Sequence, residues 1–203
     1  GVTDELVAIA QLAQTRQQDE VERRLQALAE RHQQAARELA LPKKRIPLET
    51  RLQQLISELE QLLTGVRLLQ ELSPRSLDLI YSFGERMAAP LLACAIQRVG
   101  KPSESVDARA FLRTNDRFGE AFVLLEDSRR LAREHLLPLC EAGRVPVVTG
   151  FIAATQSGQT TTLGRGGSDY SATLVGEFVE AAEIVIWTDV DGVMTADPRI
   201  VPE

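Results

Sequence analysis

Apolar residues recur with helical spacing through the first third of the chain. From Val21 to Leu39, and again from Leu48 to Leu69, they alternate in steps of four and three, which predicts two amphipathic helices. The segment 42–47 carries two prolines and is predicted to break the helix, so that the two helices pack as an antiparallel hairpin. A shorter helix is predicted before them, after the start signal Thr3-Asp4, from the apolar positions Leu6, Ile9, Ala10 and Ala13.

The apolar stripe of the hairpin has two interpretations. A coiled-coil partner module is the alternative, but the stripe spans only about three heptads and is interrupted by prolines, which favours an internal helical pair. His32 lies on this stripe, where a hydrogen-bonded core histidine is favoured over a metal ligand.

After residue 72 the chain changes to shorter apolar segments separated by turns. Ser73-Pro74 has the sequence of a helix start, and Ser82-Phe83-Gly84-Glu85 has capping-box spacing ahead of an apolar helix over 87–99, with a kink or an early break expected at Pro90. Strand, Gly-rich turn, helix and strand in that order over 145–188 predict a βαβ unit and a largely parallel sheet. The predicted strands are 103–108, 145–152 and 183–188, and the later helices are 127–141 and 168–182.

The amino-acid composition and net charge argue against several classes of function. The chain has 203 residues, 44% of them hydrophobic, and a net charge of −6, which argues against a general binder of nucleic acid or anionic membranes. The longest apolar run, Ala88–Ile96, is too short to span a bilayer. Two cysteines and two isolated histidines predict no disulfide framework, metal cluster or Ser/His/Asp triad, and suit a reducing cytoplasm.

The densest chemical signal is the run Thr160–Tyr170. Its three glycines let the backbone approach a bound group and turn amides toward an anion, and Ser168 is a candidate N-cap for the next helix. Arg165 offers a planar fork for a carboxylate or phosphate, and Asp169 can organise a cation or an ammonium group. The pattern is neither the Walker motif nor the dinucleotide fingerprint, so the residues alone leave open a phosphate-binding loop or an ordinary Gly-rich turn.

Three weaker signals accompany it. The run Trp187–Val193 with Asp197-Pro198-Arg199 follows a predicted strand, where open α/β sheets bind ligands, but taken alone it favours a solvated turn. Ser82–Glu85 by itself favours a capping box. Arg113–Gly119 is a polar loop whose arginines are either solvated or in contact with an anion.

Together these runs resemble the motifs of aspartate kinases, in the amino-acid kinase superfamily. The resemblance extends along the whole chain and is least specific over the helical pair 16–72. Glutamate and acetylglutamate kinases share the fold, but the runs at 113–119 and 164–170 favour aspartate. The matching runs, in the family's order, are Gly1–Asp4, Ser82–Glu85, Arg113–Gly119, Val148–Phe151, Thr160–Tyr170, Trp187–Val193 and Asp197–Arg199.

The resemblance implies an α/β fold, a three-layer αβα sandwich with a mainly parallel sheet and an inserted or flanking helical pair. It implies transfer of the γ-phosphate of MgATP to the β-carboxylate of L-aspartate, with no metal ligands from the protein. Arg165 is expected to bind the α-carboxylate and Glu85 the ammonium group. The residues assigned to catalysis are Arg165, Gly166, Gly167 and Asp169; those assigned to the substrate are Thr3, Glu85, Phe151, Arg165, Ser168 and Asp169; those assigned to the nucleotide are Thr188, Asp189, Met194 and Arg199.

This chemistry suits the residues present. The β-carboxylate of aspartate has an ordinary pKa of about 3.9, so it is an ionised nucleophile at neutral pH and needs no general base. Phosphoryl transfer then requires alignment and charge neutralisation. Met194 stands where the family is expected to carry a tyrosine, and a thioether cannot donate a hydrogen bond.

The family's first strand is expected to end in Lys-Phe-Gly-Gly, whereas this chain has only Lys43, Lys44 and Lys101, none in such a turn. We therefore expect a partial catalytic domain with little activity alone, lacking the first strand and the regulatory region. Residues 1–72 would be its mainly helical portion and residues 73–203 its α/β portion.

The resemblance also implies a cytoplasmic, homo-oligomeric full-length enzyme at the entry to lysine, threonine and methionine synthesis. The alternatives are another amino-acid or carbamate kinase of this fold, and a non-catalytic nucleotide-binding regulator or helical interaction module.

Overall fold

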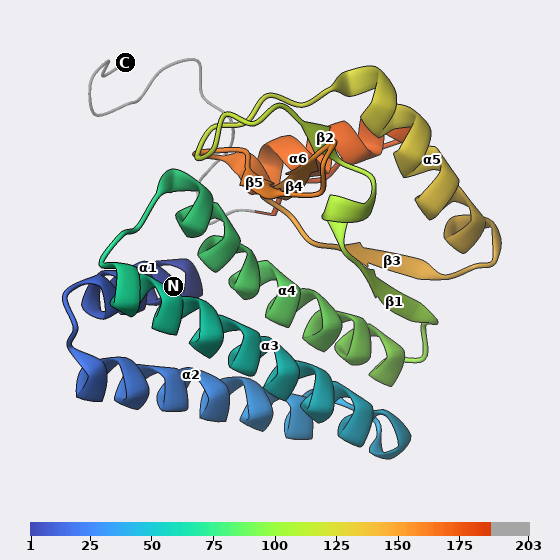
Figure 1. Cartoon of the computed structure of the whole chain (residues 1–203). Helices are drawn as coiled ribbons and strands as arrows, with labels where there is room; N and C mark the ends of the chain where they lie inside the picture. The colour runs from blue at the N-terminus through green and yellow to red at the C-terminus, as the bar shows by residue number, and fades with distance from the viewer. Residues whose placement is uncertain (188–203) are drawn as a thin grey trace, which may run out of the picture.

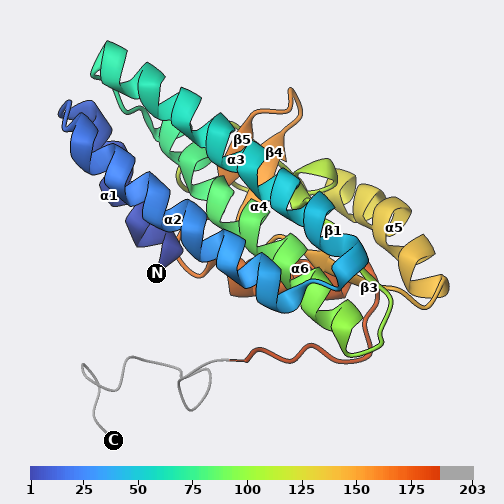
Figure 2. The same cartoon turned by 90° about the horizontal axis from the view of Figure 1, so that it is seen from below.

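A bundle of long helices forms one half of the molecule. In the computed structural model, which describes residues 1–187, this half lies against strands and two further helices (Figure 1). Seen from below, α2, α3 and α4 lie side by side, which makes the bundle a broad support for the rest of the chain (Figure 2). Its helices are α1 (Val2–Gln14), α2 (Gln18–Leu39), α3 (Pro42–Leu69) and α4 (Pro74–Arg98).

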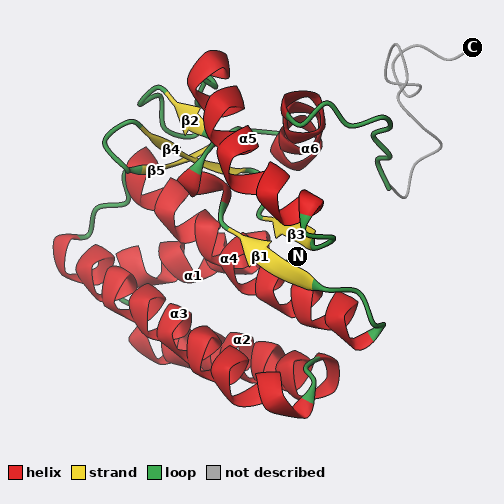
Figure 3. Cartoon of the chain, turned by 90° about the vertical axis from the view of Figure 1, so that its right-hand side faces the viewer, coloured by secondary structure: helices red, strands yellow, loops and turns green. Residues whose placement is uncertain are grey.

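The strands lie between α4 on one side and the later helices on the other (Figure 3). Strands β1 and β3 pair in parallel, β2 and β4 pair in parallel, and β4 and β5 pair antiparallel. The strands form two sheets, β1-β3 and β2-β4-β5, in which two of the three strand pairs are parallel. Their position between two layers of helices confirms the three-layer αβα sandwich with mainly parallel strands. The remaining elements are β1 (Ser103–Val106), the 3₁₀ helix η1 (Ala108–Ala110), β2 (Arg113–Thr114), α5 (Leu125–Glu141), β3 (Val145–Val148), β4 (Ile152–Thr155), β5 (Thr160–Thr162) and α6 (Gly167–Phe178).

The antiparallel hairpin of two helices is confirmed, but the segment 42–47 is not the break between them, because both of its prolines lie within α3. Pro42 occupies the first turn of α3, where a missing N–H costs nothing, and Pro47 is carried inside the helix. The connection between α2 and α3 is therefore only Ala40 and Leu41. His32 is buried as predicted, with Nδ1 2.7 Å from the carbonyl oxygen of Leu28, and burial lowers its pKa.

The prediction of a capping box at Ser82–Glu85 is wrong, because α4 runs without interruption through these residues. The helix begins where Ser73-Pro74 predicted, and the Ser73 hydroxyl accepts a hydrogen bond from the amide of Ser76 at 3.2 Å. Ser82 instead lies inside the helix and donates to the carbonyl oxygen of Leu79 at 2.7 Å. Pro90 is also carried within α4.

The strand predictions are confirmed only in part. Residues 103–106 form β1, but the run 145–152 is divided into β3 and β4 by a turn at Gly150-Phe151, where Phe151 has a φ of +64°. The segment 183–187 is no strand, and Trp187 in it is 93% exposed. Without a neighbouring strand to accept its backbone hydrogen bonds, an apolar run does not form a sheet. The parallel pairs therefore arise elsewhere than in the predicted βαβ unit.

Helix α4 makes apolar contacts on two sides. On its bundle side, Ile80, Phe83 and Met87 pack with residues of α1, α2 and α3, and on the sheet side Ala93 packs with Val147 of β3. A separate core lies between β4, α5 and α6. By length and composition alone α4 is apolar enough to cross a membrane, with a mean hydropathy of 1.3 over its most apolar 18 residues. Since half of that window is buried against the rest of the protein, we interpret α4 as a core helix.

The bundle core should dominate the stability of the helical half. Leu59 is 0% exposed on α3, so Leu59→Ala is expected to lower the free energy of unfolding in urea by about 2–5 kcal/mol. Leu69, at the end of the same helix, is 76% exposed, and Leu69→Ala should change that free energy by less than about 0.5 kcal/mol. Equal effects of the two substitutions would contradict the packing described.

Candidate active site

The Gly-rich run forms a tight turn that leads into α6. Gly164 and Gly166 have φ values of +75° and +68°, and Gly166 is the N-cap of α6, a position predicted for Ser168. A Cβ on Gly167 would lie 2.8 Å from Cδ2 of Phe151, so a side chain there would force the two segments apart. Glycine is thus required at these positions by the backbone conformation and by close approach.

This turn presents unpaired backbone donors. The amides of Arg165, Gly166, Ser168 and Asp169 have no acceptor among residues 1–187. The amides of Ser168 and Asp169 also belong to the first turn of α6, where the helix dipole favours negative charge. Because Arg165 is exposed beside them, the turn is suited to bind an anion.

A cavity of about 310 Å³ lies at this turn and brings together all the residues that the sequence assigned to the substrate and to catalysis. They come from four separate parts of the chain: the first turn of α1, the middle of α4, the β3–β4 turn and the start of α6. Its lining residues are Thr3, Glu85, Phe151, Gly164, Arg165, Gly166, Gly167, Ser168 and Asp169. A second cavity, of about 490 Å³, shares Glu85 and Ser168 with the first and extends between β3 and α6.

Glu85 is the partly buried carboxylate of this cavity. Burial raises its pKa, and a hydrogen bond from the backbone amide of Gly150 opposes that rise. Phe151 is held in its left-handed conformation by hydrogen bonds on both sides, because its amide donates to Ser171 Oγ at 3.1 Å and its carbonyl accepts from Leu163 at 3.0 Å. The Glu85 carboxylate thus shares the cavity with Phe151, whose backbone conformation is held by these hydrogen bonds.

Asp78 does not line the cavity but binds the segments that flank its Gly-rich turn, and it is not among the residues predicted from the sequence. Its side chain is fully buried on α4, and its carboxylate accepts from the amide of Gly119 at 2.9 Å and from the amide and hydroxyl of Thr162 at 3.1 and 2.6 Å. Burial raises the pKa of Asp78, while these three donors oppose the rise. The available signal was an acidic residue within an otherwise apolar helical segment.

The loop at 113–119 contributes to the scaffold of the site. The Arg113 guanidinium donates to the backbone carbonyls of Arg109 and Ala110, and Arg117 pairs with Glu120 at 3.7 Å, so neither arginine lines the cavity. Gly119 and Glu120 instead lie against Gly164, where an added Cβ would be 3.2 Å from Cγ of Glu120. The predicted nucleotide residues Thr188, Asp189, Met194 and Arg199 lie outside the described residues.

The three donors to Asp78 give a direct test of its role. Asp78→Ala leaves two backbone amides and one hydroxyl buried without an acceptor, and should lower the free energy of unfolding by about 2–4 kcal/mol. Asp78→Asn can still accept from both amides and donate to Thr162 Oγ1, so its effect should stay below about 1 kcal/mol in urea unfolding at pH 7.

The control is Asp116→Ala, which removes an exposed carboxylate from the loop that Asp78 holds and should leave the stability unchanged. If Asp78→Ala were no more destabilising than this control, Asp78 would not be the anchor of the loop.

The chain is similar to known proteins over its whole length. The whole chain, residues 1–203, matches the model of the amino acid kinase family. Lysine-sensitive aspartokinase 3 of Escherichia coli is 41% identical over 149 residues, which are 71% of this chain and 33% of that protein. The aspartokinase of Chlamydia pneumoniae is 32% identical over 203 residues, which are 100% of this chain and 42% of that protein.

Among solved structures, E. coli aspartokinase III in complex with aspartate and ADP (R-state) superposes with a TM-score of 0.84 at 33% identity, covering 98% of this chain and 43% of that one. The chain thus spans less than half the length of these relatives. Because the family model covers every residue, and because the sequence and structural similarities agree with it, the chain belongs to the amino acid kinase family.

Proposed function

We propose that this chain is part of the catalytic domain of an aspartate kinase, which transfers the γ-phosphate of ATP to the β-carboxylate of L-aspartate. The observation that carries the proposal is the single cavity in which Thr3, Glu85 and the 164–169 turn meet. The relative solved with aspartate and ADP supports the choice of substrates, since it has the same fold over nearly the whole of this chain.

Different residues of the cavity bind different groups of the aspartate substrate. Arg165 offers a bidentate fork to the α-carboxylate, and Glu85, when ionised, accepts from the ammonium group. The β-carboxylate then faces the turn, whose free amides can stabilise the negative charge of the transferring phosphoryl group. Since the nucleophile is already ionised, catalysis depends on alignment and charge neutralisation.

Mg²⁺ would enter with ATP. No three metal-ligating side chains converge anywhere in residues 1–187, so the ion would be held mainly by phosphate oxygens and water, with Asp169 as the exposed carboxylate available at the cavity. When bound, it neutralises charge on the phosphates. We also retain as proposals the nucleotide role of Thr188, Asp189, Met194 and Arg199, the cytoplasmic location, the homo-oligomeric enzyme and the place at the entry to lysine, threonine and methionine synthesis.

Activity is tested on the 203-residue chain and on the complete reading frame that encodes it. Acyl phosphate is trapped with hydroxylamine, and ATP- and aspartate-dependent hydroxamate is expected from the complete protein. Arg165→Ala should lower kcat/KM for aspartate by about 100-fold, because it removes the cation that orients the substrate. Arg31→Ala, an exposed position on α2, should have no effect.

Three outcomes would contradict this assignment. Hydroxamate formed with glutamate in place of aspartate would favour another kinase of the fold. Nucleotide binding without turnover in the complete protein would favour a regulatory module. An Arg165→Ala enzyme as active as Arg31→Ala would remove Arg165 from the substrate site.

Glu85 should make aspartate binding depend on pH. Because burial raises its pKa, Glu85 is protonated at a higher pH than an exposed glutamate, and only its ionised form attracts the ammonium group. The KM for aspartate should therefore rise as pH falls toward the raised pKa of Glu85. In Glu85→Gln the KM should be high throughout and show no such rise; a wild-type pH profile in that variant would exclude the ammonium contact.

A further inference from the structure

A cavity of about 560 Å³ lies apart from the candidate active site, between the start of α4 and the β4–β5 hairpin. It shares no lining residue with the cavity at the Gly-rich turn. Two arginines and several hydroxyl groups line it, and none of its lining residues in the described chain is acidic. Its charged and hydroxyl-bearing lining residues are Arg75, Arg109, Ser73, Ser76, Ser157 and Thr160.

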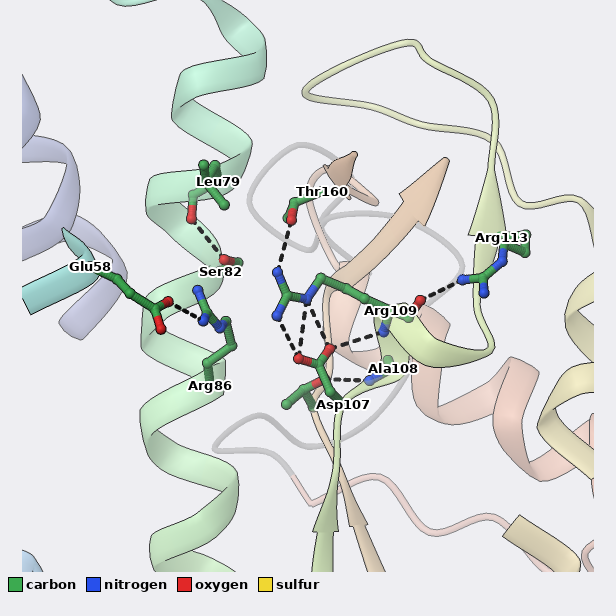
Figure 4. Close-up of polar contacts among 10 residues, drawn as sticks. Glu58, Leu79, Ser82, Arg86, Asp107, Ala108, Arg109, Arg113 and Thr160 are labelled. Atoms are coloured by element: carbon green, nitrogen blue, oxygen red, sulfur yellow. Dashed lines mark hydrogen bonds and ion pairs between the residues drawn. The ribbon is translucent and has the colours of Figure 1, made fainter. Parts of the chain in front are cut away.

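Arg109 is fixed in place at this cavity. Its Nε and Nη2 donate to the carboxylate of Asp107 at 2.9 and 2.6 Å, and its Nη1 donates to Thr160 Oγ1 at 2.9 Å (Figure 4). Burial would raise the pKa of Asp107, but the Arg109 guanidinium outweighs it and the pKa is lowered, so the pair stays ionised. A guanidinium held in this way loses little freedom when it binds a ligand.

The remaining charges leave Arg75 as the source of excess positive charge. Asp107 neutralises Arg109, and Glu58 pairs with the buried Arg86 at 2.5 Å on the bundle side of α4 (Figure 4). Arg75 is exposed in the first turn of α4 and has no acidic partner within 4 Å among residues 1–187. An anion bound beside Arg75 would compensate this unpaired charge, and the fixed Arg109 guanidinium would offer it further N–H donors.

The hydroxyl groups can serve as donors beside these cations. Ser73 Oγ and Ser76 Oγ lie 3.0 Å apart, and Ser157 Oγ lies 3.0 Å from Thr155 Oγ1, so each pair can turn a proton toward a ligand. Leu62 and Leu79 form an apolar part of the lining. Donors from several directions around two guanidinium groups fit a tetrahedral oxyanion better than a planar carboxylate.

We propose that this cavity binds a phosphate group, either as inorganic phosphate or at the head of a small phosphomonoester. Arg75 and Arg109 hold its oxygens, and the serine hydroxyls complete the shell. This site goes beyond the proposed function, because it lies at the start of β5 whereas the aspartate cavity lies beyond the end of that strand.

The test is a titration of the ¹⁵N-labelled 203-residue chain with inorganic phosphate at low ionic strength, followed by NMR. Saturable shifts are expected at the amides of Ser73, Ser76, Ser157 and Thr160. Arg75→Gln should raise the Kd from these amides by about tenfold, because it removes one charged pair of hydrogen bonds. Phenyl phosphate in place of inorganic phosphate shows whether the apolar wall contributes: tighter binding assigns the cavity to an organic phosphate, and equal binding to phosphate itself.

Two matched variants separate this site from general charge attraction. Arg51→Gln removes the same charge from an exposed position on α3 and should leave the Kd unchanged. Arg165→Gln removes the cation of the other cavity and should leave the shifts at residues 73–76 and 157–160 intact. The proposal is overturned if these amides do not shift saturably, or if Arg51→Gln weakens binding as much as Arg75→Gln.

Discussion

The hydrogen bonds to Asp78 connect the helical bundle with the loops that form the candidate active site. A buried carboxylate is costly unless donors surround it, and here three donors do so, one from the loop at Gly119 and two from Thr162 at the end of β5. One loop contains Gly119 and the other leads from Thr162 to the Gly-rich turn. Since the two loops also touch each other at Gly164, Asp78 fixes them together against α4. The position of the turn relative to the bundle therefore depends on one side chain.

The same face of α4 positions the substrate side of the cavity. Glu85 follows Asp78 by seven residues, which is two helical turns, so both lie on one face about 10 Å apart along the axis. Gly84, beside it, is close to α1: an added Cβ would lie 3.6 Å from side-chain atoms of Val2 and Leu6. This contact places the first turn of α1, with Thr3, at the cavity. One helix thus orients the turn through Asp78, supplies Glu85 and positions Thr3.

The sequence predicted the parts of this arrangement that depend on local pattern and on motif. Helix stripes placed Leu52, Leu59 and their neighbours in the core, and the resemblance gathered residues that meet at one cavity. Prediction from the sequence failed where tertiary contacts outweigh local signals. Ser82–Glu85 has capping-box spacing, but packing on both sides of α4 keeps the helix continuous through it. Asp78 was missed because its partners are more than 40 residues away in the sequence, and nothing in a local window indicates them.

The run of three threonines in β5 shows how function and packing share one strand. All three are buried, and each hydroxyl has a different partner: Thr160 with Arg109, Thr161 with Thr114 at 2.7 Å, and Thr162 with Asp78. Valine has the same shape and suits a buried strand, but it would leave a guanidinium, a hydroxyl and a carboxylate without these partners. Hydrogen bonding, more than strand propensity, therefore accounts for threonine at all three positions. Because each of its three threonines is hydrogen-bonded to a different part of the fold, β5 rigidly connects the arginine-lined cavity at its start with the Gly-rich turn beyond its end.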